Sequence, residues 1–218
     1  MEITWYGLSC FRLAERGLAA VITDPYDASQ TGYNQLKLSA NIVTISHNSP
    51  GHGCLDAVRG EPYVVTGPGE YEVGGVFITG IQTGVQKGGD DFRNTLYVFD
   101  FNSLTVAHLG DLNRAPTQSE IESMGQVNIA LIPVGGGNSL NAARAAEVVS
   151  LLEPNIVIPM HYTTPGCLVP LDGLNKFLKE MGISEIETQP SLKISEIALP
   201  EETKIIVLDR QPGERSSP

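Results

Sequence analysis

Residues 41–53 read Asn-Ile-Val-Thr-Ile-Ser-His-Asn-Ser-Pro-Gly-His-Gly, and the interpretation of the fold depends on this stretch. Its β-branched apolar start predicts a buried strand, which then breaks into a loop of small residues that carries His47 and His52. The chain has four histidines, and the other two, His108 and His161, also follow apolar runs that predict strands. If these strands are neighbours in one sheet, all four imidazoles lie along one edge of it.

Length and composition fit one globular domain. A chain of 218 residues can build one large domain with a full core, and two small domains are less favoured. No apolar run approaches the roughly 20 residues of a membrane span, and the start of the chain shows a strand pattern and no secretion signal. We expect a single domain over residues 1–208, followed by a polar, proline-containing tail, 209–218, that is disordered.

Cysteine content and charge narrow the setting. The three cysteines are an odd number without CxxC spacing, which favours a reducing cytoplasm over a disulfide framework. The net charge is −11 and the 14 basic residues are scattered, which disfavours nucleic acid as a partner. We therefore expect a small-molecule substrate or ligand and no membrane, and a homo-oligomer is compatible with the sequence.

Periodicity and turn signals along the rest of the chain predict alternating strands and helices. Strands that end in polar loops are how α/β folds place ligands, at the carboxyl ends of the strands. The expected elements are a hairpin over residues 70–81 that turns at Gly74-Gly75, helices over 119–124, 141–152 and 171–181, and buried strands over 42–45, 128–133 and 156–160.

Two of these strands share a pattern. Asn41-Ile42-Val43 runs to Ser46-His47, and Asn155-Ile156-Val157 runs to Met160-His161, while the run from Asn128 has the same start. A duplicated half-domain and the small residue alphabet of buried strands both explain this echo. The sequence leaves the two explanations open.

The histidines point to a metal site. Imidazole is the commonest metal-ligating side chain, and although a single histidine is more often structural, His47, His52 and His161 each follow an apolar strand. Asp111, in His108-Leu109-Gly110-Asp111, adds a carboxylate at a further strand end. Two histidines and one carboxylate suffice for a mononuclear site with an open position, which suits Zn or Fe(II).

These residues carry a resemblance to the metallo-β-lactamase superfamily, in its branch of Zn-dependent hydrolases. The resemblance implies an α/β fold, an αββα sandwich of two mixed sheets flanked by helices, with a metal site at one edge of the sheets. It covers residues 1 to about 165, and the segments that carry it are Trp5-Tyr6-Gly7, Thr23-Asp24-Pro25, Ser46-His47, 67–75, 94–97, 108–111, 132–136 and 158–162.

The family's first metal motif, His-x-His-x-Asp-His, is incomplete in this chain. The outer histidines match His47 and His52, but Ser49 stands for the middle histidine and Gly51 for the aspartate. A further family histidine is expected after the 76–81 strand, and the nearest aligned positions, 84 and 85, are Gly and Val. One of the two family metal subsites thus loses most of its ligands.

The resemblance implies that the other subsite keeps three ligands, His52, Asp111 and His161. We expect one metal ion there, Zn or alternatively Fe or Mn, with His47 as a fourth ligand or proton acceptor. His47 and Asp111 are the residues expected to act in catalysis. The loss of the family aspartate at Gly51 weakens the activation of the attacking water.

Two further residues are expected beside the metal ligands. Asp24 closes a strand turn and is expected to hydrogen-bond the 47–52 loop. His108 either orients a ligand or is a satisfied histidine at a strand end.

Two functional hypotheses follow. The first is a metal-dependent hydrolase of an ester, phosphodiester or lactone. The second is a metal-free, catalytically inactive protein of the same fold that serves as a ligand-binding or assembly module. Ser49 and Gly51 are the residues that separate the two hypotheses.

Overall fold

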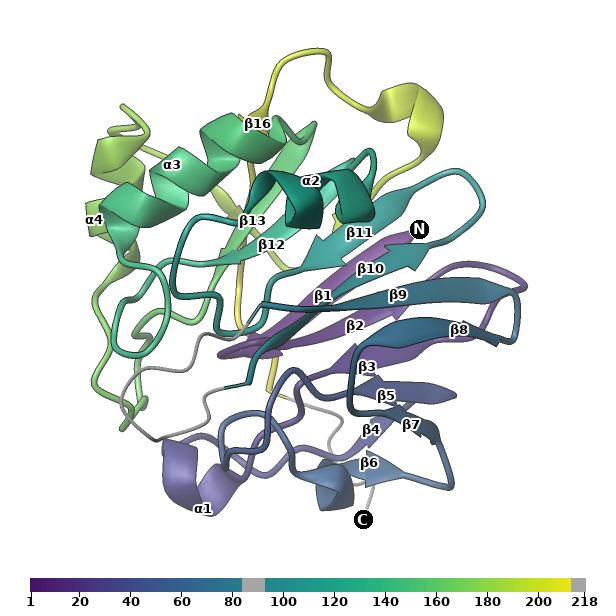
Figure 1. Cartoon of the computed structure of the whole chain (residues 1–218). Coiled ribbons are helices and arrows are strands. Elements are labelled where there is room, and N and C mark those ends of the chain that lie inside the picture. Colours follow the sequence, from purple (N-terminus) through teal and green to yellow (C-terminus); the bar gives the residue numbers. More distant parts are fainter. Residues whose placement is uncertain (84–92, 213–218) are drawn as a thin grey trace.

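The computed structural model describes residues 1–83 and 93–212, and in it two mixed β-sheets form the middle of the molecule (Figure 1). The first sheet has the strand order β15-β1-β2-β3-β5-β7, and the second has the order β16-β13-β12-β11-β10-β9-β8. The strands of the first sheet are β1 (Glu2–Gly7), β2 (Cys10–Ala14), β3 (Val21–Thr23), β5 (Ile42–Thr44), β7 (Tyr63–Val65) and β15 (Leu192–Lys193). The strands of the second sheet are β8 (Gly69–Val73), β9 (Val76–Gln82), β10 (Thr95–Asp100), β11 (Thr105–His108), β12 (Ile129–Pro133), β13 (Ile156–Met160) and β16 (Lys204–Ile205).

Short elements surround the sheets. Two pairs of two-residue strands run parallel, β4 with β6 and β14 with β17. No helix among the described residues is long and apolar enough to cross a membrane. The short elements around the sheets are the helices α1 (Ala28–Thr31), α2 (Gln118–Met124), α3 (Ala142–Leu152) and α4 (Leu174–Glu180), the 3-10 helices η1 (Leu55–Ala57) and η2 (Glu196–Ala198), and the strands β4 (Leu38–Ser39), β6 (Val58–Arg59), β14 (Thr188–Gln189) and β17 (Val207–Leu208).

Each sheet is antiparallel on one side and parallel on the other. In the first sheet β3, β5 and β7 are parallel, and in the second β11, β12, β13 and β16 are parallel. Parallel strands place their carboxyl ends at the same edge of a sheet, and ligands of open α/β sheets bind there. The loops that follow β3, β5, β11 and β13 therefore meet at one edge of the molecule.

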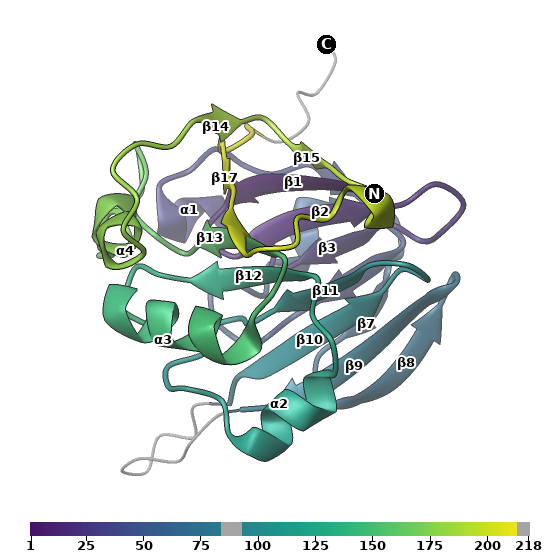
Figure 2. The same cartoon turned by 90° about the horizontal axis from the view of Figure 1, so that it is seen from above.

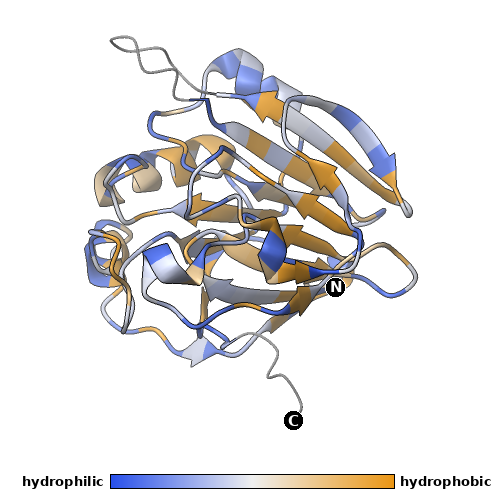
Figure 3. Cartoon of the chain, turned by 90° about the horizontal axis from the view of Figure 1, so that it is seen from below, coloured by the Kyte–Doolittle hydropathy of each residue, from blue (hydrophilic) through white to orange (hydrophobic). Residues whose placement is uncertain are grey.

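The main core fills the space between the sheets and continues outward to the helices. Trp5 and Phe11 of the first sheet and Phe99 of the second are buried in it, and α2 and α3 lie on the far face of the second sheet (Figure 2). The strands of both sheets are largely hydrophobic, whereas the turns around them are largely hydrophilic (Figure 3). Burial of this apolar surface is the main force that holds the layers together.

A second apolar cluster covers the outer face of the first sheet. It includes Tyr26, Tyr33, Leu36 and Val43. The segment from α1 to β6 packs here, so this face is covered by short elements and loops, with α1 as its helix. The predicted αββα sandwich of two mixed sheets and flanking helices is confirmed, with a thinner helical layer on this side.

The helices follow the predictions closely. Helix α3 begins after Asn141, whose side-chain oxygen accepts a hydrogen bond from the Arg144 backbone N–H, and it buries Ala145 and Val148 as the periodicity predicts. Helix α4 begins at Leu174, three residues later than predicted, because the preceding segment turns back toward the second sheet. There the Asp172 backbone N–H donates to the Gly135 carbonyl at 2.8 Å.

The asparagines of the repeated pattern pair neighbouring parallel strands. Asn41 Oδ1 accepts from the Ala20 backbone N–H at 2.9 Å, just before β3. Asn128 Oδ1 accepts from the Thr105 backbone N–H at 2.9 Å, at the start of β11, and Asn128 Nδ2 donates to Asn155 Oδ1 at 3.2 Å. The repeated sequence pattern thus corresponds to asparagine side chains that hydrogen-bond a neighbouring segment at the amino ends of parallel strands.

The chain stays packed past the predicted domain limit at Leu208. The Asp209 backbone N–H donates to the Gln189 carbonyl at 2.9 Å, and the Gln211 backbone N–H donates to the Trp5 carbonyl at 2.8 Å. Residues 213–218 of the predicted tail lie outside the described residues.

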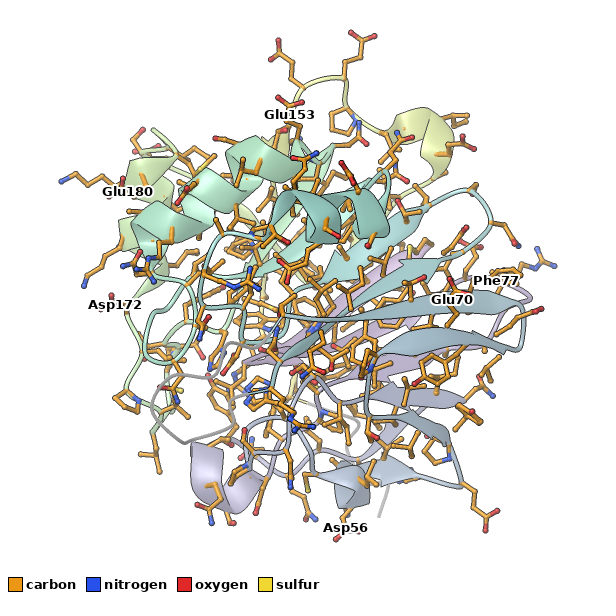
Figure 4. All side chains as sticks on the ribbon, viewed as in Figure 1. Asp56, Glu70, Phe77, Glu153, Asp172 and Glu180 are labelled. Atoms are coloured by element: carbon orange, nitrogen blue, oxygen red, sulfur yellow. The ribbon has the colours of Figure 1, made fainter. Side chains whose placement is uncertain are left out.

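Acidic side chains decorate the surface. Asp56, Glu70, Glu153 and Glu180 lie at the periphery of the molecule, and Glu70 projects from the edge strand β8 (Figure 4). Exposed charges of this kind are well solvated, so the net charge of −11 is compatible with a buried apolar core.

Candidate metal centre

The predicted site residues meet at the edge where the parallel strands end. His47 and His52 follow β5 of the first sheet, while Asp111 follows β11 and His161 follows β13 of the second. His52, Asp111 and His161 are buried, and His47 is half-buried. The site therefore lies across the seam between the two sheets.

Asp111 is the centre of this group. Its Oδ2 lies 3.7 Å from His47 Nε2, and its Oδ1 lies 3.5 Å from His52 Nε2 and in close contact with His161 Nδ1. One ligand atom each of His47, His52 and Asp111 lies within 4.8 Å of the other two. The structure thus brings together the four residues that the sequence predicts as metal ligands.

Asp24 fixes the ring of His52. Asp24 Oδ2 accepts a hydrogen bond from His52 Nδ1 at 2.8 Å, and Asp24 Oδ1 accepts one from the Ser46 backbone N–H at 2.7 Å. A carboxylate only accepts hydrogen bonds, so Nδ1 of His52 carries a proton, and Nε2 is the ring nitrogen that faces Asp111 and can bind a metal. Carboxylates that hold metal-ligating histidines by the other ring nitrogen act in this way.

Ser46 sets the ring of His47 by the same logic. Its hydroxyl donates its one proton to Asp24 Oδ2 at 2.6 Å, so it accepts from His47 Nδ1, which lies 3.1 Å from Ser46 Oγ. His47 Nε2 then presents a lone pair toward Asp111. Nε2 of His47 and Nε2 of His52 thus both face the Asp111 carboxylate.

The group fits a metal ion. Asp111 Oδ1 and His161 Nδ1 are buried and contact each other closely, yet neither atom has a hydrogen-bond partner. Buried polar atoms normally have partners, and a cation among these atoms would satisfy them. Three imidazole nitrogens and a carboxylate are a donor set that suits Zn and also Fe or Mn.

The pKa shifts follow from burial and from this crowding. Burial raises the pKa of Asp111, but the nearby His161 and His52 outweigh burial and hold that pKa well below its ordinary value. Burial lowers the pKa of His52, while Asp111 and Asp24 raise it above its ordinary value. Burial and the neighbouring His52 lower the pKa of His47 to about 4, so its imidazole is neutral near pH 7.

His108 lies behind the site. Its Nε2 donates to the Ser9 carbonyl at 2.8 Å, and its Nδ1 accepts from the Gly110 backbone N–H at 3.3 Å. Both ring nitrogens are therefore used within the fold, and burial lowers the pKa of this side chain. Its Nε2 lies 4.0 Å from Asp24 Oδ2. Of the two predicted roles, this geometry fits a satisfied histidine that packs against Asp24.

Asn94 holds Asp111 in place, a role that sequence reasoning missed. Its Oδ1 accepts from the Asp111 backbone N–H at 2.8 Å, and its Nδ2 donates to Thr83 Oγ1 at 2.9 Å and to the Leu109 carbonyl at 3.1 Å. The resemblance included Asn94, but nothing in the spacing of residues assigned it to Asp111. Gly110 makes room for this contact, because a Cβ there would lie 2.3 Å from Asn94 Oδ1.

Further hydrogen bonds tie the two sheets together beside the site. The Tyr97 hydroxyl of β10 donates to the Ile45 carbonyl at 2.9 Å, and the Thr95 backbone N–H donates to the Ser46 carbonyl at 2.8 Å. These bonds align the end of β5, and with it His47 and His52, against the second sheet.

The two substituted motif positions lie in the same loop. Ser49 uses its carbonyl oxygen to accept the backbone N–H groups of His52 and Gly53, each at 3.0 Å. Gly51 has open space, since a Cβ there would meet only Leu8 Cδ1 at 3.8 Å and Ser49 Oγ at 3.9 Å. Packing therefore does not forbid an acidic side chain at position 51. Positions 84 and 85, where a family histidine was sought, lie outside the described residues.

A cavity of about 550 Å³ opens over these residues. Its walls come from the turn after β1, from α1, and from the loops that follow β5, β11, β12 and β13. The residues that line it are Leu8, Gln30, Thr31, His47, Asn48, Ser49, Pro50, Gly51, His52, Asp111, Gly137, Asn138, His161, Val169, Pro170 and Leu171.

Solved structures of other proteins are similar to this chain in fold. A protein of the metallo-β-lactamase superfamily from Thermotoga maritima superposes with a TM-score of 0.78 and 33% identity, over 95% of this chain and 97% of that one. A metallo hydrolase from Ignicoccus hospitalis, Igni18, shares the fold at 18% identity, with a TM-score of 0.67 over 98% of this chain and 96% of that one.

Relatives found by sequence have lower identity to this chain, but the similarity extends over most of its length. A UPF0173 protein from Pyrococcus abyssi is 27% identical over 76% of this chain and 85% of its own length. A UPF0173 metal-dependent hydrolase from Natranaerobius thermophilus is 25% identical over 79% of this chain and 87% of its own. The family model described as the beta-lactamase superfamily domain matches residues 2–161, which include all four residues of the candidate metal centre. The chain therefore belongs to the β-lactamase superfamily domain family.

Proposed function

We propose that this protein is a metal-dependent hydrolase with a mononuclear site. His52, Asp111 and His161 hold the ion, which is Zn or alternatively Fe or Mn, and His47 is the fourth ligand or a proton acceptor. The observation that carries the proposal is the buried pair Asp111 Oδ1 and His161 Nδ1, which lack hydrogen-bond partners and lie beside the imidazoles of His47 and His52. Relatives that are named metal-dependent hydrolases support the same conclusion.

The protein's own residues prepare the site for hydrolysis. A bound metal ion would supply a Lewis acid that polarises the bond to be cleaved and acidifies water. Asp24 orients His52 through its Nδ1–H, and Asn94 orients Asp111 through its backbone N–H. His47 presents Nε2 at the half-buried mouth of the site, where it can bind the metal or take a proton. Gly51 leaves water activation to His47 and Asp111.

The substrate is a small molecule, because the cavity of about 550 Å³ lies within the size range of small-molecule sites. Esters, phosphodiesters and lactones are the substrate classes open to such a centre. The absence of a disulfide framework in the sequence supports a reducing cytoplasm as the place where the protein acts.

A second candidate is a catalytically inactive ligand-binding or assembly module. It is favoured by Ser49 and Gly51, which offer no strong ligand where the family motif has histidine and aspartate. In that case the cavity would bind a ligand and leave it unchanged.

Metal content separates the two candidates. The parent protein, purified without chelator and assayed by mass spectrometry, is expected to carry about one equivalent of metal. His161→Ala is expected to lose it, whereas Asp172→Asn, which changes a carboxylate that pairs with Lys176 at 2.6 Å, is expected to keep it. A parent without metal above background, even after incubation with Zn, would overturn the proposed hydrolase.

A further inference from the structure

One wall of the cavity is apolar. Leu8 reaches it from the turn between β1 and β2, and Val169, Pro170 and Leu171 reach it from the loop before α4. Leu8 is held next to the metal centre, since its carbonyl accepts from the His161 backbone N–H at 3.1 Å and from Trp5 Nε1 at 2.9 Å. The apolar surface therefore begins directly beside a proposed metal ligand.

The loop that carries the rest of this wall is anchored at both ends. The Leu168 backbone N–H donates to the Thr31 carbonyl at 2.9 Å, and the Asp172 backbone N–H donates to the Gly135 carbonyl at 2.8 Å. The chain also passes close to α1, because a Cβ at Gly32 would lie 2.4 Å from the Gly166 carbonyl oxygen. Hydrogen bonds on both sides thus hold the segment 169–171 in place, and its surface is a fixed part of the cavity wall.

The cavity also has a polar, uncharged part of its lining. It carries the amide side chains of Gln30, Asn48 and Asn138. Among the described residues that line the cavity there is no lysine or arginine, and Asp111 is the one carboxylate. Sites that bind phosphate groups use Arg or Lys side chains or the N-termini of helices to meet the negative charge. Among the described lining residues, an anionic substrate would therefore meet no lysine or arginine, and the bound metal would be its main positive partner.

Resting on the proposed hydrolase function, we infer that the site takes an uncharged carboxylic ester or lactone with an apolar group, and discriminates against phosphodiesters. The apolar group lies on Leu8 and Val169–Leu171, and the carbonyl faces the metal centre. In the reaction the oxygen of water bonds to the acyl carbon and the bond from that carbon to the ester oxygen breaks. One proton of water goes to the leaving oxygen, so an ester gives a carboxylic acid and an alcohol, and a lactone gives a hydroxy acid.

The experiment compares substrate classes in the Zn-loaded full chain. Hydrolysis is measured with p-nitrophenyl acetate, butyrate and octanoate, γ-nonalactone and bis(p-nitrophenyl) phosphate. Binding of two compounds that are not cleaved, 2-nonanone and dibutyl phosphate, is measured by calorimetry. Two variants place the same charge in different positions: Val169→Lys on the apolar wall, and Val64→Lys on the exposed face of β7 as the matched control.

We expect kcat/KM to rise with acyl chain length and to exceed that of the phosphodiester at least about tenfold, and 2-nonanone to bind more tightly than dibutyl phosphate. Val169→Lys is expected to weaken 2-nonanone binding at least about tenfold with metal content unchanged, and Val64→Lys is expected to match the parent. Faster cleavage or tighter binding of the phosphate compounds, or a Val169→Lys variant that behaves like Val64→Lys, would overturn the inference. If metal is bound and no compound is cleaved, the proposed hydrolase fails, and the two binding measurements still decide the nature of the pocket.

Discussion

Asp24 and His52 form a buried pair in which the carboxylate accepts the Nδ1–H of the imidazole at 2.8 Å. Asp24 reaches this position with a backbone φ of 40°, in the left-handed region that costs a residue with a side chain about 1–3 kcal/mol. The hydrogen bonds from Ser46 and His52 hold it there. Asp24 thus keeps a strained backbone conformation while it holds the ring of His52, a proposed metal ligand. We infer that the role of Asp24 is to position His52.

Asp24→Asn is therefore expected to weaken metal binding without removing a ligand. An amide offers both a donor and an acceptor, so it no longer dictates which nitrogen of His52 carries the proton. We expect Zn affinity to fall about 10- to 100-fold, measured by competition with a chromogenic chelator. Asp172→Asn serves as the control, and equal affinity in the two variants would show that Asp24 does not position the ligand.

Gly51→Asp tests whether the substituted motif can be restored. The space around Gly51 admits a side chain, and the added carboxylate would stand beside His52 in the loop. We expect Zn affinity to increase about tenfold, because a further anionic oxygen joins the donor set. Gly51→Ala adds the same Cβ without a carboxylate and is expected to match the parent in the same titration. A Gly51→Asp variant that binds no more tightly than Gly51→Ala would place position 51 outside the metal's reach.

Gly110→Ala tests the close approach that sets Asp111. The backbone φ of Gly110 is 55°, and its Cβ would lie 2.3 Å from Asn94 Oδ1. Gly182 also has a positive φ, 71°, but has nothing within 4 Å of its Cβ position, so Gly182→Ala serves as the control for backbone strain. We expect about 1 kcal/mol of destabilisation for Gly182→Ala and about 3 kcal/mol or more for Gly110→Ala, by chemical denaturation. Equal losses would mean that Asn94 and Ser46, the two side chains nearest to the added methyl group, move aside at no energetic penalty.

Glu120 makes the free energy of unfolding depend on pH in the acidic range. It accepts hydrogen bonds from both terminal nitrogens of Arg114, at 2.7 and 2.8 Å, and from the Thr117 backbone N–H at 2.6 Å. Burial raises the pKa of Glu120, but these bonds outweigh burial and lower the pKa below its ordinary value of 4.5. A carboxyl with a lowered folded-state pKa stabilises the protein above its unfolded pKa, and this stability is lost as the pH falls through the folded pKa.

Glu120→Gln is consequently expected to destabilise the protein at pH 7 and to flatten the decline of unfolding free energy between about pH 5 and pH 3. Denaturant titrations across that range provide the measurement. Glu122→Gln, on the same helix, is the control and is expected to keep the slope of the parent. A Glu120→Gln variant with the parent's slope would show that the ion pair with Arg114 does not contribute to acid sensitivity.

The sequence was informative where local pattern and general sheet geometry suffice. The strands before His47, Asp111 and His161 were predicted from apolar runs, and the rule that ligands lie at carboxyl ends placed these residues together. The hairpin at Gly74-Gly75 was also predicted, and the structure confirms it.

The parts that escaped prediction depend on contacts between distant segments. The apolar wall joins Leu8 to Val169–Leu171, and neither segment has a periodicity that indicates the other. The backbone of Leu8, like that of His161, adopts a positive φ, 47° and 51° respectively, although neither is a glycine. Sequence patterns flag such a conformation at glycine, so at these positions tertiary contacts alone reveal it.

The candidate metal centre lies between the two sheets, and this position has a consequence for how firmly the sheets are held together. His47 and His52 belong to one sheet and Asp111 and His161 to the other, so a metal ion held by these residues would act as a cross-link between the sheets. Its binding free energy would add to the stability of the folded state and oppose opening of the sandwich at this edge. Amide hydrogen exchange in β5 and β11 should then slow together when Zn is added, while exchange in β8, at the opposite border of the second sheet, stays unchanged.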